Sequence, residues 1–301
     1  MKTRNGIKLI WAFVSVFGMI LSSSCSKDRT EPKDNRADYQ KMDDYYNSKK
    51  QKEQEFEIDN SGNGPIIGNQ GTKIWISKEK LMYPNGDSVH WPFTIKLVEL
   101  YKPKDMIWYQ MPTVSSGTLL TTGGEVRVRA FKDNVELILR PDETWTVEMP
   151  NSHPDSAMKI YYGVEAASFV DWTPNPAGNF NTTSYGYTGE IKKMGWTACG
   201  KEAYNSSAST IAYSFTSKTD NLNYVGIFLY LPDKKGLMQA YNQTSAALPI
   251  GEKMKIIMMA MNDSSQLFSF NKEIQISTNN QIDVTLTKIS DAELTAILDG
   301  L

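Results

Sequence analysis

The chain has 301 residues, of which 40% are hydrophobic and 22% charged, and its 32 basic and 34 acidic residues leave a formal net charge of −2. A near-neutral chain offers no basic surface to neutralise a phosphate backbone, which argues against nucleic acid as the main partner. The chain has two cysteines, Cys25 and Cys199, and two histidines, His90 and His153. These numbers are too small for a disulfide-rich scaffold, a four-cysteine zinc site or a histidine-rich metal centre. We therefore expect no metal and no cofactor.

Residues 1–24 have the pattern of a secretory signal. Three positive charges precede an apolar run over residues 9–21, and small residues follow it. About 13 apolar residues are too few to span a hydrocarbon core about 30 Å thick. The run Leu-Ser-Ser-Ser-Cys at 21–25 resembles a bacterial lipobox, with Ser22 where the strict pattern has leucine. The sequence predicts cleavage before Cys25 and its acylation with fatty chains such as palmitate. The alternative is an ordinary signal peptide with an incidental cysteine.

Residues 25–70 are predicted to be a lipidated, charged and largely disordered tether. Residues 26–60 hold 8 basic and 10 acidic residues, more than half of the segment. Such a composition buries too little apolar area to offset its ordering entropy. A solvated helix within residues 37–58, docking through Tyr45, Tyr46 and Phe56, is the alternative for part of it.

The residues after the cysteine favour the outer membrane. Ser26 and the acids Asp28 and Glu31 are compatible with outer-membrane sorting, and acids at this place resemble a surface-export signal of the Bacteroidota, here interrupted by Lys27 and Arg29. We expect a lipid-anchored protein on the cell surface, with the periplasmic face as the alternative.

From residue 72 onward the sequence predicts β-structure. Apolar and polar residues alternate over residues 72–76, 93–100, 125–130 and 144–149, with turn-forming residues between these runs. Alternation with period two turns one face of a strand to a core and the other to water. The predicted core residues are Ile74, Ile76, Ile95, Leu97, Val126, Val128 and Val147. Short strands with regular turns predict an antiparallel β-sandwich.

Several motifs in this region carry a resemblance to a known group. They are Gly-Thr-Lys-Ile-Trp-Ile at 71–76, Phe-Thr-Ile-Lys-Leu-Val-Glu at 93–99, Pro-Thr-Val-Ser-Ser-Gly-Thr-Leu-Leu at 112–120 and Met-Lys-Ile-Tyr-Tyr-Gly at 158–163. The chain thereby resembles uncharacterised outer-membrane lipoproteins of the Bacteroidota. This implies that residues 71–172 form a domain similar to ZU5, a β-sandwich of scaffolding and signalling proteins. The His-Phe-Ser tripeptide at which some ZU5 domains cleave themselves is missing, so no self-cleavage is expected.

A Pro-, Gly- and Asn-rich loop at 173–179 predicts a domain boundary, and residues 173–301 form the second predicted β domain. Its predicted core residues are Ile227, Leu229, Ile256, Met258 and Val284. The end of the chain, residues 290–298, predicts a short helix, because Ser290 and Glu293 have capping-box spacing. With no helices alternating between the strands, the predicted class is all-β, with two antiparallel sandwich-like domains.

Catalytic motifs are missing from the sequence. It holds no Gly-x-Ser-x-Gly turn and no glycine loop followed by Lys-Ser/Thr. Cys199 and His153 would be a candidate thiolate pair, but a buried cysteine beside Trp196 is the favoured interpretation. The run Asn-Gly-Asp at 85–87 is interpreted as a turn and not as a calcium loop. We therefore predict no catalytic residue and no enzyme.

Aromatic residues are the remaining candidates for ligand contact. Trp172, Tyr185, Tyr187 and Trp196 are candidates for stacking on a ligand, although the flanks of Trp196 favour a core position. Ser88 and Ser156 are candidate O-glycosylation sites, since each follows aspartate in a pattern that resembles the one modified in the Bacteroidota.

Two functions are weighed. The leading hypothesis is a non-catalytic interaction or structural module, anchored to the outer membrane, with a protein or glycan partner and no nucleic acid. The alternative is a glycan-binding accessory lipoprotein that captures polysaccharide, with the aromatic residues supplying affinity. Fold class alone does not separate the two.

Overall fold

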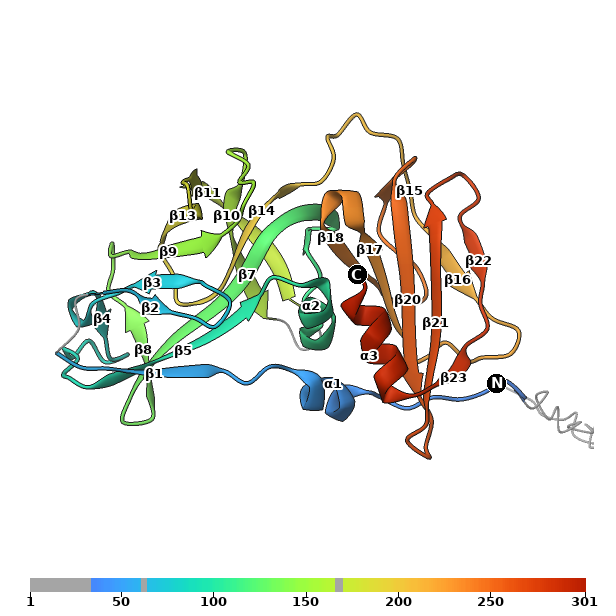
Figure 1. The fold of residues 1–301 in the computed structure, drawn as a ribbon, viewed down its shortest axis with the longest axis horizontal. Helices are drawn as coiled ribbons and strands as arrows, with labels where there is room; N and C mark the ends of the chain where they lie inside the picture. The colour runs from blue at the N-terminus through green and yellow to red at the C-terminus, as the bar shows by residue number, and fades with distance from the viewer. Residues whose placement is uncertain (1–33, 61–63, 166–169) are drawn as a thin grey trace, which may run out of the picture. The chain divides into compact units, whose positions relative to one another are not determined.

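The computed structural model describes residues 34–60, 64–165 and 170–301, and β-strands dominate them (Figure 1). The predicted all-β class is confirmed, with short helices α1 (Asp43–Lys49), α2 (Pro103–Tyr109) and α3 (Asp291–Asp299). Contacts divide the chain after Asn35, and the residues from Arg36 to Leu301 form one compact unit.

The N-terminal half, residues 54–202, is built from two antiparallel sheets. The larger follows the order β1 (Gln54–Ile58), β5 (Phe93–Leu100), β7 (Thr118–Lys132), β14 (Gly195–Glu202), β10 (Lys159–Glu165) and β11 (Val170–Asn179). Off this path, β6 (Val114–Ser115) and β8 (Val135–Leu139) pair with β7, and β4 (Leu81–Met82) pairs with β8. The smaller follows the order β12 (Asn181–Thr182), β13 (Gly186–Ile191), β9 (Trp145–Pro150), β3 (Lys73–Trp75) and β2 (Ile66–Ile67).

The core of the N-terminal half lies between these two sheets. Alternate residues of β5 and β7 face it, so the predicted residues Ile95, Leu97, Val126 and Val128 are buried there. Ile74 and Val147 meet them from the smaller sheet, in which β3 pairs with β9. Ile76 is only partly buried against this core. Period-two alternation therefore predicted six of the seven core residues of this half correctly.

The N-terminal half does not end at residue 172, where the sequence predicts a boundary. The predicted loop at 173–179 continues strand β11, at the edge of the larger sheet. Pro174 and Pro176 are tolerated in an edge strand, because their missing N–H groups remove no bond from an inner ladder. β13 and β14 then return to the two sheets, so the half extends to Glu202.

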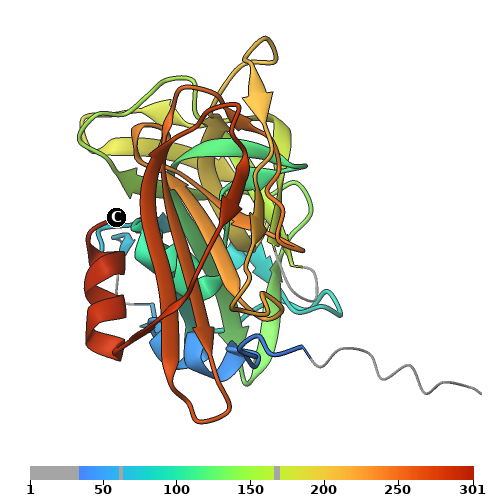
Figure 2. The same ribbon diagram turned by 90° about the vertical axis from the view of Figure 1, so that its right-hand side faces the viewer.

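The C-terminal half, residues 203–301, contains a five-stranded antiparallel sheet (Figure 2). Its order is β18 (Gly236–Ala240), β17 (Gly226–Leu231), β20 (Lys253–Met261), β21 (Leu267–Gln275) and β23 (Thr287–Ile289). Two small pairs accompany it, β15 (Thr210–Ile211) with β19 (Leu248–Pro249) and β16 (Ser214–Thr216) with β22 (Gln281–Asp283). The β16–β22 pair is parallel, which differs from the purely antiparallel sheets expected.

The core of the C-terminal half also follows the predicted pattern. Ile227, Leu229, Ile256, Met258 and Val284 are all buried in it. The helix at the end of the chain is confirmed as well: the Ser290 side chain accepts from the Glu293 backbone, and the Glu293 side chain accepts from the Ser290 backbone.

A third apolar cluster, here named the shared core, joins the two halves. Helix α2 contributes Met106, Ile107 and Trp108, and its first position is Pro103, whose fixed φ suits a helix start. Other members come from both halves: Val98, Leu100, Trp172, Trp196, Phe228, Tyr230, Ile257, Met259 and Leu294. The halves therefore bury apolar surface against each other, and the unit is not two separate domains on a linker.

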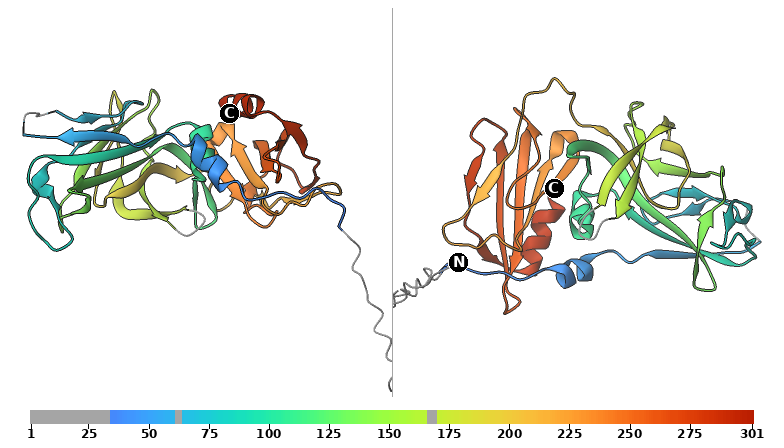
Figure 3. Two further views of the ribbon diagram at one scale, coloured as in Figure 1. Left: turned by 90° about the horizontal axis from the view of Figure 1, so that it is seen from below. Right: turned by 180° about the vertical axis from the view of Figure 1, so that it is seen from behind.

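The charged segment 36–58, here named the N-terminal strap, is ordered and crosses both halves (Figures 1 and 3). Ala37 and Gln40 form bridges with Asp220 and Met261 of the C-terminal half. The strap then forms α1, and its last residues form β1, paired with β5 of the N-terminal half. The expectation of a largely disordered tether does not hold for this part of the chain.

Apolar side chains of the strap explain its order. Tyr39 enters the C-terminal core, while Met42 and Tyr46 enter the shared core. Phe56 and Ile58 pack on the N-terminal core from β1. These contacts supply the buried area that a count of charges leaves out.

Candidate functional site

A groove of about 740 Å³ lies where the N-terminal strap and the two halves meet. Its volume is within the range of about 300–1,000 Å³ that is usual for small-ligand sites. The lining combines aromatic rings, amides and basic groups with a single acid: Lys41, Met42, Asp43, Tyr46, Asn47, Lys50, Tyr109, Gln110, Met111, Arg127, Val170, Trp196, Tyr224, Val225, Gly226 and Gln239. These residues come from α1 and the residues beside it, the end of α2 and the two residues after it, β7, β11, β14, β18, and the start of β17 with the turn before it.

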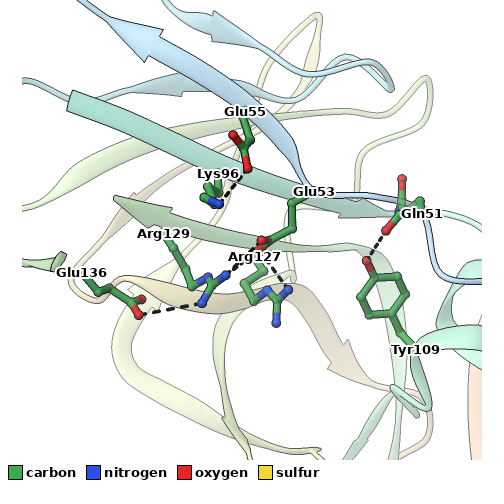
Figure 4. Close-up of polar contacts among 8 residues, drawn as sticks. All are labelled: Gln51, Glu53, Glu55, Lys96, Tyr109, Arg127, Arg129 and Glu136. Carbon is green, nitrogen blue, oxygen red and sulfur yellow. Dashed lines mark hydrogen bonds and ion pairs between the residues drawn. The ribbon is translucent and has the colours of Figure 1, made fainter. Parts of the chain in front are cut away.

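Polar contacts of the strap fix the side of the groove formed by β7 (Figure 4). Glu53 accepts hydrogen bonds from Arg127 at 3.0 Å and from Arg129 at 2.9 Å. The Tyr109 hydroxyl donates to the backbone carbonyl of Gln51 at 2.6 Å. The Arg127 guanidinium also lies over the Trp196 ring, 5.1 Å from its centre. Arg127 and Tyr109 are therefore held in defined positions at the groove wall.

The Tyr46 hydroxyl, at the groove wall, makes no hydrogen bond with the described residues and is here named the orphan hydroxyl. Tyr46 is only 6% exposed, and its hydroxyl oxygen is buried with no hydrogen-bond partner among the described residues. A Cβ on Gly226, which also lines the groove, would lie 2.2 Å from this oxygen, so the hydroxyl occupies the space that a side chain at 226 would take. A buried hydroxyl without a partner costs free energy, and such groups call for an explanation.

Two residues of the groove have left-handed backbone angles. Tyr224 has φ +62° and Gln110 has φ +54°, a region in which glycine is the usual residue. Gln110 ends helix α2, where the left-handed conformation is a common cap. Tyr224 is 59% exposed, and bulky residues are rarely found in this conformation. The chain therefore keeps a large exposed ring at a position that would suit glycine.

The four aromatic residues predicted to stack on a ligand do not form an exposed platform. Trp172 and Tyr187 are each only 1% exposed, in the shared core and the N-terminal core respectively. Trp196 is buried in the shared core, as its flanks suggested, but it lines the groove. Tyr185 lies away from the groove, where its hydroxyl donates to Gly71 and the Lys73 ammonium lies 3.7 Å from its ring centre. The predicted surface role is therefore wrong for Trp172 and Tyr187, because both rings are packed inside cores.

The candidate thiolate pair is not assembled either. Cys199 is buried in the N-terminal core, and burial raises the pKa of its thiol well above the usual value. A protonated, inaccessible thiol is a poor nucleophile. His153 is exposed, and its Nδ1 lies 2.9 Å from the hydroxyl of the adjacent Ser152. Cys199 is thus a core residue, as the favoured interpretation stated.

Two other sequence interpretations concern ion sites. In the run 85–87, Asp87 N–H donates to the Asn85 side chain at 3.1 Å, and the Tyr83 N–H donates to the Asp87 carbonyl at 3.0 Å, so this run is a turn. Within residues 34–60, 64–165 and 170–301, no group of three or more His, Cys, Asp or Glu side chains could hold a metal ion.

Of the candidate modification sites, the structure describes Ser88 and Ser156. Cys25 lies outside the described residues. Ser88 and Ser156 are both exposed, and Ser88 accepts a hydrogen bond from Arg140 at 3.1 Å. Glycosylation of the two serines stays a prediction. In the described parts of the chain, no helix has the length and apolar character needed to cross a membrane.

Most of the groove residues are not predicted by the sequence, including Asn47, Gln110, Tyr224 and Gln239. These residues lie far apart in the chain, and only the ordered strap brings Asn47 to the others. One available signal was the presence of Tyr39, Met42 and Tyr46 in an otherwise charged segment, since all three side chains are buried.

Comparison with known proteins identifies no relative: no family model, curated protein or solved structure matches the chain.

Proposed function

We propose that this protein is a lipid-anchored, non-catalytic recognition protein of the bacterial outer membrane, and that the groove is its ligand-binding site. The observation that carries the proposal is the groove itself, where an exposed ring, three amide side chains and an orphan hydroxyl meet at the junction of the two halves. Convergent polar groups in a partly apolar cleft are what a binding site requires.

Binding is a better fit than catalysis for the groove residues. Burial raises the pKa of Tyr109 to about 12 and holds that of Tyr46 further above its usual value. Both hydroxyls therefore stay protonated at neutral pH and are suited to donate hydrogen bonds, not to act as general bases. Among the described residues, no histidine, no cysteine and only one carboxylate, Asp43, line the groove.

The membrane anchor is proposed from the sequence. The apolar run at 9–21 and the lipobox-like residues before Cys25 support it, as does the resemblance of residues 71–163 to Bacteroidota lipoproteins with a ZU5-like domain. Several acyl chains on one cysteine would hold the protein to a membrane much more firmly than a single chain.

We expect Cys25→Ser to release the protein from the membrane or to leave it unprocessed, because serine offers no thiol for acylation. Fractionation of the producing cells, with mass spectrometry of the N-terminus, measures both. Wild-type levels in the membrane fraction after correct cleavage of the variant would contradict the lipid anchor.

Filling the groove should abolish ligand capture. Asn47 is exposed on α1 and lines the groove, so Asn47→Trp places a large side chain there, while Ser48→Trp on the same helix adds one outside the lining. The measurement is cross-linking of the full-length lipoprotein to cell-surface components. We expect Asn47→Trp to lose the adducts that wild type and Ser48→Trp form. Equal adducts for all three would place recognition elsewhere.

A further inference from the structure

We infer that the groove binds a short oligosaccharide, with the Tyr224 ring as its stacking face and the Tyr46 hydroxyl as a buried hydrogen-bond partner. This inference rests on the proposed function and names the class of ligand. Two independent observations support it, one at the rim of the groove and one at its wall.

The first observation is the exposed ring at the rim. Tyr224 lines the groove, is 59% exposed and has φ +62°. An L-residue is strained in the left-handed region, and strain of this kind is often kept where a side chain has a task. An exposed, flat, partly polar ring is suited to the apolar face of a sugar, which presents C–H groups to an aromatic surface.

The second observation is the orphan hydroxyl. Tyr46 is buried, its oxygen has no partner among the described residues, and the same side chain lines the groove. The hydroxyl stays protonated, because burial raises its pKa. A ligand oxygen that reaches it would regain the hydrogen bond that the free protein lacks.

The remaining polar groups favour sugar hydroxyls over other ligands. Asn47, Gln110 and Gln239 each carry one amide, which has both a donor and an acceptor. The Asn47 oxygen already accepts from the Lys50 ammonium at 2.8 Å, and the Gln239 oxygen accepts from the Tyr241 hydroxyl at 3.2 Å. The amide N–H groups are therefore the donors that a sugar oxygen can meet.

Three basic residues line the groove, Lys41, Lys50 and Arg127, and two of them are bonded within the protein: Arg127 to Glu53 at 3.0 Å and Lys50 to Asn47 at 2.8 Å. A nucleotide would need several such groups turned toward its phosphates. Amide and tyrosine groups of this kind match a ligand with many neutral hydroxyls.

The test uses the full-length protein in detergent and a panel of malto-, cello-, xylo- and manno-oligosaccharides, with affinity from calorimetry and stability from thermal unfolding. Two variants remove the proposed contacts. Tyr46→Phe deletes only the orphan hydroxyl, and Tyr224→Gly deletes the ring while relieving the left-handed strain. Each has a matched control: Tyr39→Phe removes a hydroxyl that is bonded to Asp220, and Asp142→Gly relieves a φ of +65° outside the groove.

We expect wild type to bind at least one member of the panel. Tyr46→Phe should weaken that binding several-fold and Tyr224→Gly about tenfold, as lost hydrogen bonds and ring contacts do. Both variants should unfold within a few degrees of wild type, because one removes an unpaired group and the other offsets strain relief against a more flexible unfolded chain. Tyr39→Phe should instead lower the unfolding temperature and keep the affinity, and Asp142→Gly should keep it as well.

Two results would overturn the inference. Binding that neither Tyr46→Phe nor Tyr224→Gly weakens would place the sugar outside the groove. A wild-type protein that binds no member of the panel, while Asn47→Trp still abolishes cross-linking to a protein, would show that the groove recognises a protein. The second result would keep the groove as the binding site and would reject a saccharide as its ligand.

Discussion

Trp172→Ala should lower the free energy of unfolding by about 3–5 kcal/mol, the usual cost of truncating a buried tryptophan. The Trp172 side chain is 1% exposed in the shared core, and its indole N–H donates to the Pro112 carbonyl at 2.9 Å. The substitution would leave a cavity and remove the partner of a buried carbonyl, and both effects destabilise. Denaturant unfolding of the full-length protein measures the change.

Trp75→Ala is the matched control for this variant. Trp75 is 40% exposed on β3 and makes one side-chain hydrogen bond, to Glu148 at 3.1 Å. Its loss should cost about 1 kcal/mol or less, since little apolar area is buried. If Trp172→Ala kept wild-type stability but lost ligand, the ring would have to face a ligand in solution, as the sequence analysis proposed.

The strands and cores were predictable because alternation is a local signal. Ile95 and Leu97 on β5, or Ile227 and Leu229 on β17, show their buried face within a few residues of sequence. The capping box of α3 is local in the same way, because Ser290 and Glu293 are only three residues apart. Each of these features needs no knowledge of a distant partner.

The N-terminal strap was not predictable from the same kind of signal. Its charges suggested solvation, yet Glu53 meets Arg127 and Arg129, and Glu55 meets Lys96, all on strands far along the chain (Figure 4). These pairs are partly exposed, so each is worth little alone. They remove the penalty of placing charges on a sheet, while the stabilisation comes from buried side chains such as Tyr46.

The groove escaped prediction for the same physical reason. Asn47, Tyr224 and Gln239 come together only after the strap and the two halves have packed, and no spacing in the sequence relates them. The predicted aromatic cluster was wrong for the opposite reason, because residues close in sequence are not close in the fold. Trp172 and Tyr187 are close in sequence, but they face different cores: Trp172 lies in the shared core, and Tyr187 lies in the core between the two sheets of the N-terminal half.

Glu125→Gln should make the protein more stable than wild type above about pH 5, and increasingly so as the pH rises. Glu125 is buried on β7, where its cross-strand neighbours are Leu100 and Ala198 of the shared core. Neither carboxyl oxygen has a hydrogen-bond partner among the described residues, and burial raises the pKa of this carboxyl well above the usual 4.5. The folded protein therefore keeps the proton that the unfolded chain releases.

The sign of the effect follows from proton counting. Below the unfolded pKa both states are protonated, so Glu125 does not make stability depend on pH. Between the unfolded and folded pKa the folded state holds one more proton, so the free energy of unfolding falls by up to about 1.4 kcal/mol per pH unit. Glutamine does not titrate, so the difference between variant and wild type should widen over that range. Denaturant unfolding at a series of pH values measures the difference.

Glu99→Gln is the control of opposite sign. Glu99 is also buried, but its carboxylate accepts from the backbone N–H groups of Thr72 and Gln70, each at 2.9 Å, and from the Gln54 side chain at 2.8 Å. In the glutamine variant an amide N–H donor would face N–H donors, which should lower the free energy of unfolding by about 1–3 kcal/mol. Parallel pH profiles for wild type and Glu125→Gln would mean that the Glu125 carboxyl is paired or hydrated in solution. A widening gap would identify it as a buried neutral acid, which the fold tolerates at a cost that grows with pH.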